Sequence, residues 1–167
     1  QYLDYIQVDM DAKDNRRSKA NMASMNPDLF WSTVNYGFHY QYMHNTLQLN
    51  RRVEGDKPFF SNISRLSGIS STDWSWGPLL ADFDNDGWKD LFISNGIRRE
   101  INNKDYFNDI KLRPMSKDSL LYYTNQIPSE AISNFTFKNN KDLTFSDVSK
   151  DWGLDDKNFS NGATYAD

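Results

Sequence analysis

The sequence predicts a mainly β fold with short helical insertions, assembled from a repeated unit of short strands. Three observations favour it: a residue pattern that recurs after about 85 residues, an acidic loop between two strand-like segments, and a high share of aromatic residues. Aromatic residues make up 15% of the chain, which suits large packing side chains between sheets. With 167 residues, the chain is long enough for one ordinary domain.

The acidic loop, residues 82–90, reads DFDNDGWKD. Its carboxylates alternate along the loop and point inward around one centre: Asp82, Asp84, Asp86 and Asp90. Acids held this close repel one another, and a bound hard cation removes that conflict. The backbone carbonyl of Trp88 is expected as a further ligand, and Gly87 supplies the sharp turn before it. The loop therefore predicts a Ca²⁺ site.

This loop differs from an EF-hand, which needs a bidentate Glu at position 12 and a helix on each side. Position 12 is Ile93, and the flanking segments 74–81 and 91–94 read as strands. Pro78 indicates an edge strand or a bulge in the first of them. The alternative to a metal site is a solvated turn of Asp, Asn and Gly, but such a turn needs only one or two of these acids.

The repeat is clearest where residues 60–65 (FSNISR) align with residues 145–150 (FSDVSK). The match continues without a gap to Ala81-Asp82 and Ala166-Asp167. Each copy reads as strand, turn, strand, glycine-containing connection, strand and acidic loop. The repeat units are predicted at about 5–90 and 91–167.

The repeat also suggests an origin for the two ends of the chain. Asp4 aligns with Asp90, and Asp167 aligns with Asp82. Both are therefore predicted as acids of further, partial metal loops. The chain is expected to be a fragment spanning roughly two periods of a longer repeat protein.

Repeats of short strands build propellers or solenoids, in which no single repeat can bury its faces alone. A propeller closes with about 4–8 blades, so further blades or a neighbouring protein are expected to cover the sheet edges. Two segments of different texture, about 11–40 and 98–133, are expected to be helical or loop insertions. In the first, Asn26-Pro27-Asp28 is typical of a helix start.

Charge and composition exclude several classes of partner and chemistry. The net charge is −4 and the basic residues are scattered, which is unlike a nucleic-acid-binding surface. No apolar run approaches the roughly 18 residues of a membrane span. The absence of cysteine excludes disulfides and thiolate metal sites.

No catalytic residue is assigned. The arginine pairs, among them Arg16-Arg17, are expected on solvated faces or in salt bridges. Acids in polar loops are usually solvated, which is the expectation for Glu100, Asp105, Asp109 and Glu130. His39 and His44 lie in a strand-like aromatic stretch, where packing or surface roles are expected. Packing between blades, rather than sugar stacking, is expected for Trp74, Trp76 and Trp88.

The segment ADFDNDGWKDLFISNG, with TDWSWG before it and FSNGATYAD at the end of the chain, resembles the FG-GAP/VCBS repeat proteins. Within them it is most similar to the bacterial group associated with ASPIC/UnbV domains, and NTLQLN also fits that group. The resemblance covers nearly the whole chain. It implies roughly two blades of a β-propeller related to that of integrin α-subunits. It also implies Ca²⁺ in the loops between blade strands, here held by Asp82, Asp84, Asp86, Asp90 and the carbonyl of Trp88.

The function expected from the resemblance is a calcium-stabilised module that binds a protein or a glycan, or acts as a scaffold, without catalysis. Such modules are exported, and the expected places are the bacterial cell surface, the outer membrane or the periplasm. Two alternatives stay open. One is an accessory part of an envelope enzyme that processes carbohydrate or lipid, and the other is an architectural subunit of an outer-membrane complex.

Overall fold

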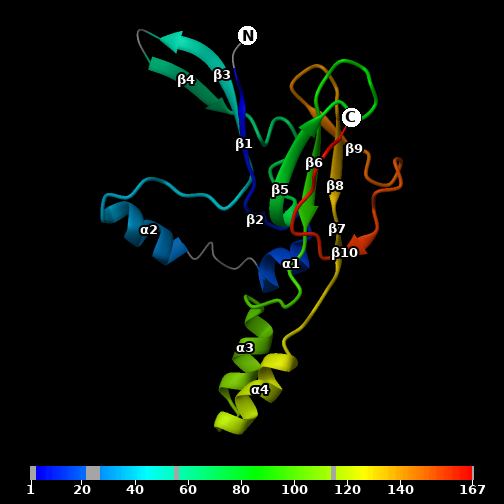
Figure 1. Ribbon diagram of the computed structural model, residues 1–167. Helices are drawn as coiled ribbons and strands as arrows, with labels where there is room; N and C mark the ends of the chain where they lie inside the picture. The colour runs from blue at the N-terminus through cyan, green and yellow to red at the C-terminus, as the bar shows by residue number, and fades with distance from the viewer. Residues whose placement is uncertain (1–2, 22–26, 55–56, 114–115, 167) are drawn as a thin grey trace.

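The computed structural model describes residues 3–21, 27–54, 57–113 and 116–166, and within these ranges it is mainly β with four short helices (Figure 1). The strands are β1 (Tyr5–Gln7), β2 (Met10–Asp11), β3 (Thr46–Glu54), β4 (Lys57–Asn62), β5 (Asp73–Ala81), β6 (Asp90–Asn95), β7 (Ile132–Ser133), β8 (Phe135–Asn139), β9 (Phe145–Asp147) and β10 (Lys157–Asn158). The helices are α1 (Asn15–Ala20), α2 (Pro27–Asn35), α3 (Lys104–Lys111) and α4 (Lys117–Asn125).

The strands form two main antiparallel sheets and one short pair. One sheet has the order β1-β3-β4, the other has the order β2-β5-β6-β8-β9, and β7 pairs with β10. Within the larger sheet, β5, β6, β8 and β9 are antiparallel neighbours in this order, and α3, α4 and β7 lie between β6 and β8 along the chain. The predicted mainly β fold is confirmed, and this curled sheet is compatible with part of a propeller-like fold.

The core joins the two sheets around β6. Leu91 of β6 pairs with Leu80 on one side and with Phe137 on the other, and it is fully buried. The buried cluster also contains Ile69 and Ile93. Partly buried apolar residues pack against it from both sheets, namely Ile6, Val8, Leu47, Phe135 and Phe145. The larger sheet buries β6 because this strand has a neighbour on each side.

Two turns that lie 85 residues apart have the same backbone hydrogen bonds. In the first turn, the amide of Ile69 donates to the carbonyl of Ser64 at 3.1 Å. In the second, the amide of Leu154 donates to the carbonyl of Ser149 at 2.7 Å. The glycine before each donor has a left-handed backbone, with φ of +77° and +67°. The sequence match between residues 60–65 and 145–150 therefore has a counterpart in backbone structure.

The helices fall within the two segments expected as insertions. Side-chain caps begin three of them: Asp14 for α1, Asn103 for α3 and Ser116 for α4. Helix α2 begins at Pro27, as predicted, while the predicted cap Asn26 lies outside the described residues. In Figure 1, α3 and α4 form a hairpin that projects from the sheets. None of the helices among the described residues is long and apolar enough to cross a membrane.

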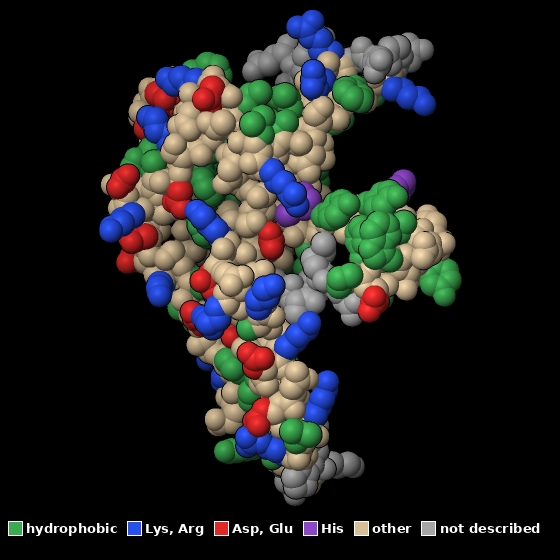
Figure 2. Space-filling view, turned by 180° about the vertical axis from the view of Figure 1, so that it is seen from behind, with side chains coloured by type: hydrophobic (Ala, Val, Ile, Leu, Met, Phe, Trp, Pro, Cys, Tyr) green, Lys and Arg blue, Asp and Glu red, His purple; other side chains and the backbone are tan. Residues whose placement is uncertain are grey.

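The aromatic stretch around the two histidines was predicted to be strand-like, and this is wrong, because residues 38–45 form no strand. Instead the stretch folds back on α2, where Phe30 contacts the rings of Tyr40 and Tyr42 at centroid distances of 6.2 and 5.4 Å. Figure 2 shows hydrophobic side chains gathered on this separate lobe. The ring contacts within the lobe take the place of the strand pairing that was expected.

Candidate metal centre

The acidic loop closes the hairpin between β5 and β6, as predicted, with Ala81 and Asp90 as the last paired residues. Carboxylates of the loop accept backbone amides of the same loop and so fix its conformation. Asp82 accepts the amides of Asp86 and Gly87 on its two carboxylate oxygens, at 3.0 and 2.8 Å. Gly87 has a φ of +87°, which its lack of a Cβ allows. The loop is therefore a turn built on Asp side chains.

The structure brings three of the four predicted acidic ligands together. Asp82, Asp84 and Asp86 each offer a carboxylate oxygen, and these oxygens lie within 4.8 Å of one another. Oδ1 of Asp84 is buried and has no hydrogen-bond partner. Hard oxygen ligands suit Ca²⁺, Mg²⁺ or Mn²⁺. The donor set and the unpartnered oxygen fit a hard cation, although they do not select Ca²⁺ among these ions.

Asp90, the fourth predicted ligand, stands outside this group and has another role. It is fully buried, with no exposed surface. Its two carboxylate oxygens accept the amide of Phe83 at 3.1 Å and the amide of Asn139 at 2.9 Å. Asp90 thereby joins the base of the acidic loop to the end of β8. The side chain of Trp88, whose carbonyl was predicted as a ligand, is about half exposed.

Asp4 makes one of the two backbone contacts that Asp90 makes. Oδ1 of Asp4 accepts the amide of Asn50 at 2.9 Å, just as Oδ1 of Asp90 accepts that of Asn139. The two asparagines also donate from Nδ2 to equivalent carbonyls, at 3.3 Å to Leu3 and 3.0 Å to Lys89. This agreement supports the alignment of Asp4 with Asp90. The other predicted partial-loop acid, Asp167, lies outside the described residues.

Two lysines from the β8–β9 hairpin reach into the acidic loop. Nζ of Lys138 forms an ion pair with Asp84 and lies 3.6 Å from Oδ2 of Asp86. Nζ of Lys141 lies 3.2 Å from the same oxygen of Asp86. The hydrogen bond to Asp84 raises the pKa of Lys138. Partial burial raises the pKa of Asp86, but the amide of Trp88 and the two lysines outweigh it and lower this pKa.

The contact of these lysines with the loop could not be predicted from the sequence, because no local pattern marks them. They follow the loop by about fifty residues, and only the pairing of β6 with β8 brings them near it. The repeat offered one signal, since Arg52 and Lys141 occupy equivalent turns. Each has a left-handed backbone and donates its amide to the asparagine two residues before it, at 2.9 and 2.8 Å.

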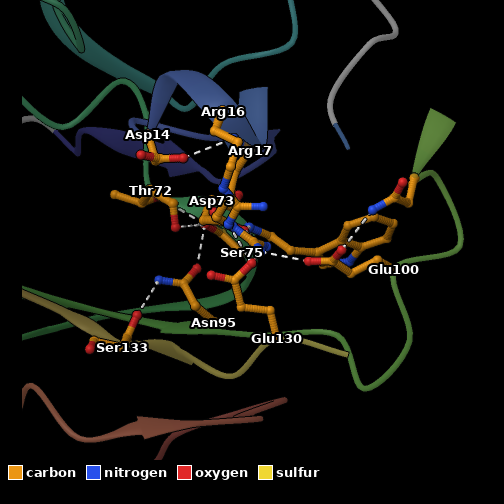
Figure 3. Close-up of polar contacts among 12 residues, drawn as sticks. Asp14, Arg16, Arg17, Thr72, Asp73, Ser75, Asn95, Glu100, Glu130 and Ser133 are labelled. Carbon is orange, nitrogen blue, oxygen red and sulfur yellow. Dashed lines mark hydrogen bonds and ion pairs between the residues drawn. The ribbon is translucent and has the colours of Figure 1, made fainter. Parts of the chain in front are cut away.

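A second charged cluster, centred on Arg17, lies at the opposite end of β5 (Figure 3). The guanidinium binds Asp73 through two hydrogen bonds, from Nε at 2.6 Å and from Nη2 at 2.9 Å. Its Nη1 donates to Glu100 at 2.6 Å and to Glu130 at 3.0 Å. Arg16 donates to the same oxygen of Glu130 at 2.6 Å. The cluster connects α1, the start of β5 and both ends of the α3–α4 hairpin.

The expectation that the acids of the insertions are solvated is wrong for Glu100, which is only 3% exposed. Of the alternatives for Arg16-Arg17, the structure supports salt-bridge partners, and Arg17 is buried. Asp73 has a φ of +70°, a strained value that its ion pair and burial maintain. The carboxylates of Asp73, Glu100 and Glu130 are paired with arginine and act as its counter-ions. The general acid of a glycosidase is instead a protonated carboxyl group.

Acid is expected to weaken the Arg17 cluster. The hydrogen bond from Arg16 lowers the pKa of Glu130 below its ordinary value of 4.5, with Arg17 adding to the effect. The ionised form therefore stabilises the fold above pH 4.5, and this contribution is lost as the pH falls through the lower folded pKa. Urea unfolding between about pH 5.5 and 3 should show stability falling with acid. The slope should be smaller in Glu130→Gln, and an unchanged slope would contradict this assignment.

The tryptophans divide between packing and surface positions. Trp74 is buried against Ala12, which agrees with a packing role. Trp76 is about half exposed, and its Nε1 donates to the carbonyl of Gly96 at 2.6 Å. Trp88 borders a hollow of about 560 Å³ between the two sheets, with Leu47 and Phe145 on its apolar wall. Trp88 therefore borders a space large enough for a small ligand.

No protein-family model, curated protein or solved structure matches this chain. The resemblance to FG-GAP/VCBS repeat proteins stays a prediction that depends on the motifs of the chain itself.

Proposed function

We propose that this chain is part of a calcium-stabilised β-propeller of the FG-GAP/VCBS type, acting as a non-catalytic binding or scaffolding module. The single observation that carries the proposal is the acidic loop. It groups the carboxylates of Asp82, Asp84 and Asp86 within reach of one cation and leaves one buried oxygen of Asp84 without a partner. Carboxylates in this arrangement are stabilised by a hard cation.

The matched hydrogen bonds of the two turns, and of Asp4 and Asp90, support a repeated architecture. On this proposal, β5, β6, β8 and β9 form one blade, and β1, β3 and β4 belong to the preceding one. The outer strands of these sheets would then be covered by further blades or by a neighbouring protein. Export to the cell surface or periplasm is proposed from the resemblance alone.

Two surfaces support binding as the role of the module. The lobe of α2 exposes several large apolar side chains, namely Leu29, Trp31, Tyr36, Phe38, Tyr40 and Tyr42. Trp88 offers a half-exposed ring beside the hollow between the sheets. Exposed aromatic rings of this kind suit a protein or glycan ligand. A purely architectural subunit would bind no glycan. A glycan array tests this: binding by the unsubstituted chain that is lost in Trp88→Ala supports a glycan-binding role.

Calcium is expected to stabilise the chain. With a dissociation constant of about 0.1 mM, typical of the tighter extracellular modules, about 1 mM Ca²⁺ adds roughly 1.4 kcal/mol to the free energy of unfolding. Thermal unfolding with Ca²⁺ and with a chelator measures this difference. Asp84→Asn should abolish it, because the substitution removes a charged ligand.

The matched control is Asp151→Asn, which makes the same change in an exposed turn outside the loop and should keep the response to Ca²⁺. Mg²⁺ at equal concentration should stabilise less, because its octahedral geometry and tightly held water suit this turn poorly. If Ca²⁺ leaves the unfolding of the unsubstituted chain unchanged, the structural-calcium proposal is wrong.

A further inference from the structure

The lysines in the acidic loop bear directly on how it binds a cation. Nζ of Lys138 contacts Oδ2 of Asp84 and lies 3.6 Å from Oδ2 of Asp86. It therefore lies between two of the three grouped carboxylates, where a bridging cation would also lie. The ammonium group supplies a single charge at this place and coordinates through hydrogen bonds alone.

Charge balance explains why the loop keeps lysines nearby. The loop contains four carboxylates, at Asp82, Asp84, Asp86 and Asp90. The two ammonium groups that form ion pairs with the loop, from Lys138 and Lys141, reach Asp84 and Asp86, so two of the four carboxylates have no ion pair among the described residues. The buried, unpartnered Oδ1 of Asp84 shows that the ammonium groups satisfy the loop only in part. A divalent cation would satisfy it better than a lysine does.

The structure lets Lys138 leave without a change of backbone. Its backbone belongs to β8, which pairs with β6 on one side and with β9 on the other. The next residue, Asn139, is fixed to Asp90 by its amide and to Lys89 by its side chain. The side chain of Lys138 itself is 39% exposed, so its ammonium can move into water. Exchange therefore needs only a change of rotamer.

We propose that Lys138 is a resident counter-cation: it holds the acidic loop together without metal and is exchanged for a divalent cation when one binds. Lys138 thus sets the cation affinity of the loop, with Lys141 as a weaker second contributor. The inference rests on the proposed function, since it requires that the loop binds a cation.

The test compares Lys138→Met with the unsubstituted chain by calorimetric titration with Ca²⁺. Loss of the competing positive charge should tighten binding about tenfold, since a unit charge about 4 Å from a divalent ion costs several RT even in water-like screening. Without metal, in chelator, the same variant should melt at a lower temperature, because its carboxylates then lack their counter-ion. Opposite effects in the two conditions distinguish exchange from a general loss of stability.

The matched control is Lys89→Met. It removes a positive charge from the loop, where no ion pair involves Lys89 among the described residues. Lys89→Met should change the Ca²⁺ affinity and the melting temperature in chelator much less than Lys138→Met does. Lys138→Arg keeps the charge, provides a second variant if Lys138→Met folds poorly, and should bind Ca²⁺ within about twofold of the unsubstituted chain.

The outcomes separate this inference from the proposed function. If the unsubstituted chain and the variants all fail to bind Ca²⁺, the proposed function is wrong. The proposed exchange of Lys138 for a cation is then wrong as well. If the unsubstituted chain binds and Lys138→Met binds equally or more weakly, the exchange alone is overturned. Tighter binding by Lys138→Met together with a lower melting temperature in chelator supports it.

Discussion

Replacing Arg17 by Met is expected to lower the free energy of unfolding by about 3–5 kcal/mol. The substitution leaves Asp73 and Glu100 buried without their shared counter-ion, at 6% and 3% exposure. Because a domain of this size has only about 5–15 kcal/mol in total, such a loss is a large share of its stability. Urea unfolding followed by tryptophan fluorescence measures it.

Arg16→Met is the matched control for this prediction. Arg16 is adjacent and has the same side chain, but it is 63% exposed, and its ion pair among the described residues is with the partly exposed Glu130. Its loss should cost no more than about 1 kcal/mol. Arg17→Lys should fall between the two, because it keeps the charge and loses the two-pronged bond to Asp73.

A double substitution tests whether the cost comes from unpaired charge. In the Arg17→Met background, Glu100→Gln removes one buried negative charge and should restore part of the lost stability. If Arg17→Met costs no more than Arg16→Met, the cluster contributes little to the fold. If Glu100→Gln makes the double variant still less stable, the cost arises from lost packing instead of unpaired charge.

The sequence predicted those features that depend on neighbouring residues. The strand–loop–strand arrangement around Asp82 followed from alternating acids and one glycine, and the start of α2 followed from Pro27. The inward grouping of three acids followed from their spacing. Pro78 also occurs as expected, on a stretch of β5 that, among the described strands, pairs with β6 alone. These signals operate within about ten residues, where backbone geometry limits the choices.

The charged contacts could not be predicted in the same way, because they join distant segments. Arg17 meets Glu100 across 83 positions, and Lys138 meets Asp84 across 54. Each of these residues, taken alone, has the sequence context of a solvated surface charge. Their pairing depends on the register of the strands and on the path of the inserted segments. The local sequence pattern determines neither of these. The internal repeat was the one long-range signal, and the matched hydrogen bonds of Asp4 and Asp90 agree with the alignment it suggested.

Asp90 illustrates how a residue predicted as a metal ligand can also have a structural role. Its position at the end of the acidic pattern indicated a metal ligand, yet in the structure its carboxylate accepts two backbone amides at the base of the loop. A carboxylate that accepts amides keeps its charge and fixes the direction of both chain segments. Asp90 therefore stabilises the loop even without a cation, and it holds the β8 end from which Lys138 extends.

Asp90→Ala is expected to destabilise the chain by about 2–6 kcal/mol in the presence of chelator. The substitution leaves the amides of Phe83 and Asn139 without their acceptor, and each unsatisfied buried donor costs about 1–3 kcal/mol. Asp4→Ala is the matched control, because within the described part of the chain Asp4 accepts one backbone amide, and it is exposed. Its loss should cost less than about 1 kcal/mol.

Measuring both variants with and without Ca²⁺ separates the two roles of the carboxylate. A structural role alone predicts that Asp90→Ala loses stability in chelator and still gains stability from Ca²⁺ through the grouped acids, Asp82, Asp84 and Asp86. If Asp90 is also a Ca²⁺ ligand, Asp90→Ala should in addition lose the stabilisation that Ca²⁺ gives. Equal stabilities of Asp90→Ala and Asp4→Ala in chelator would contradict the structural role. Because Asp90 accepts its hydrogen bonds from backbone amides, which need no metal, the loss in chelator is expected whichever result Ca²⁺ gives.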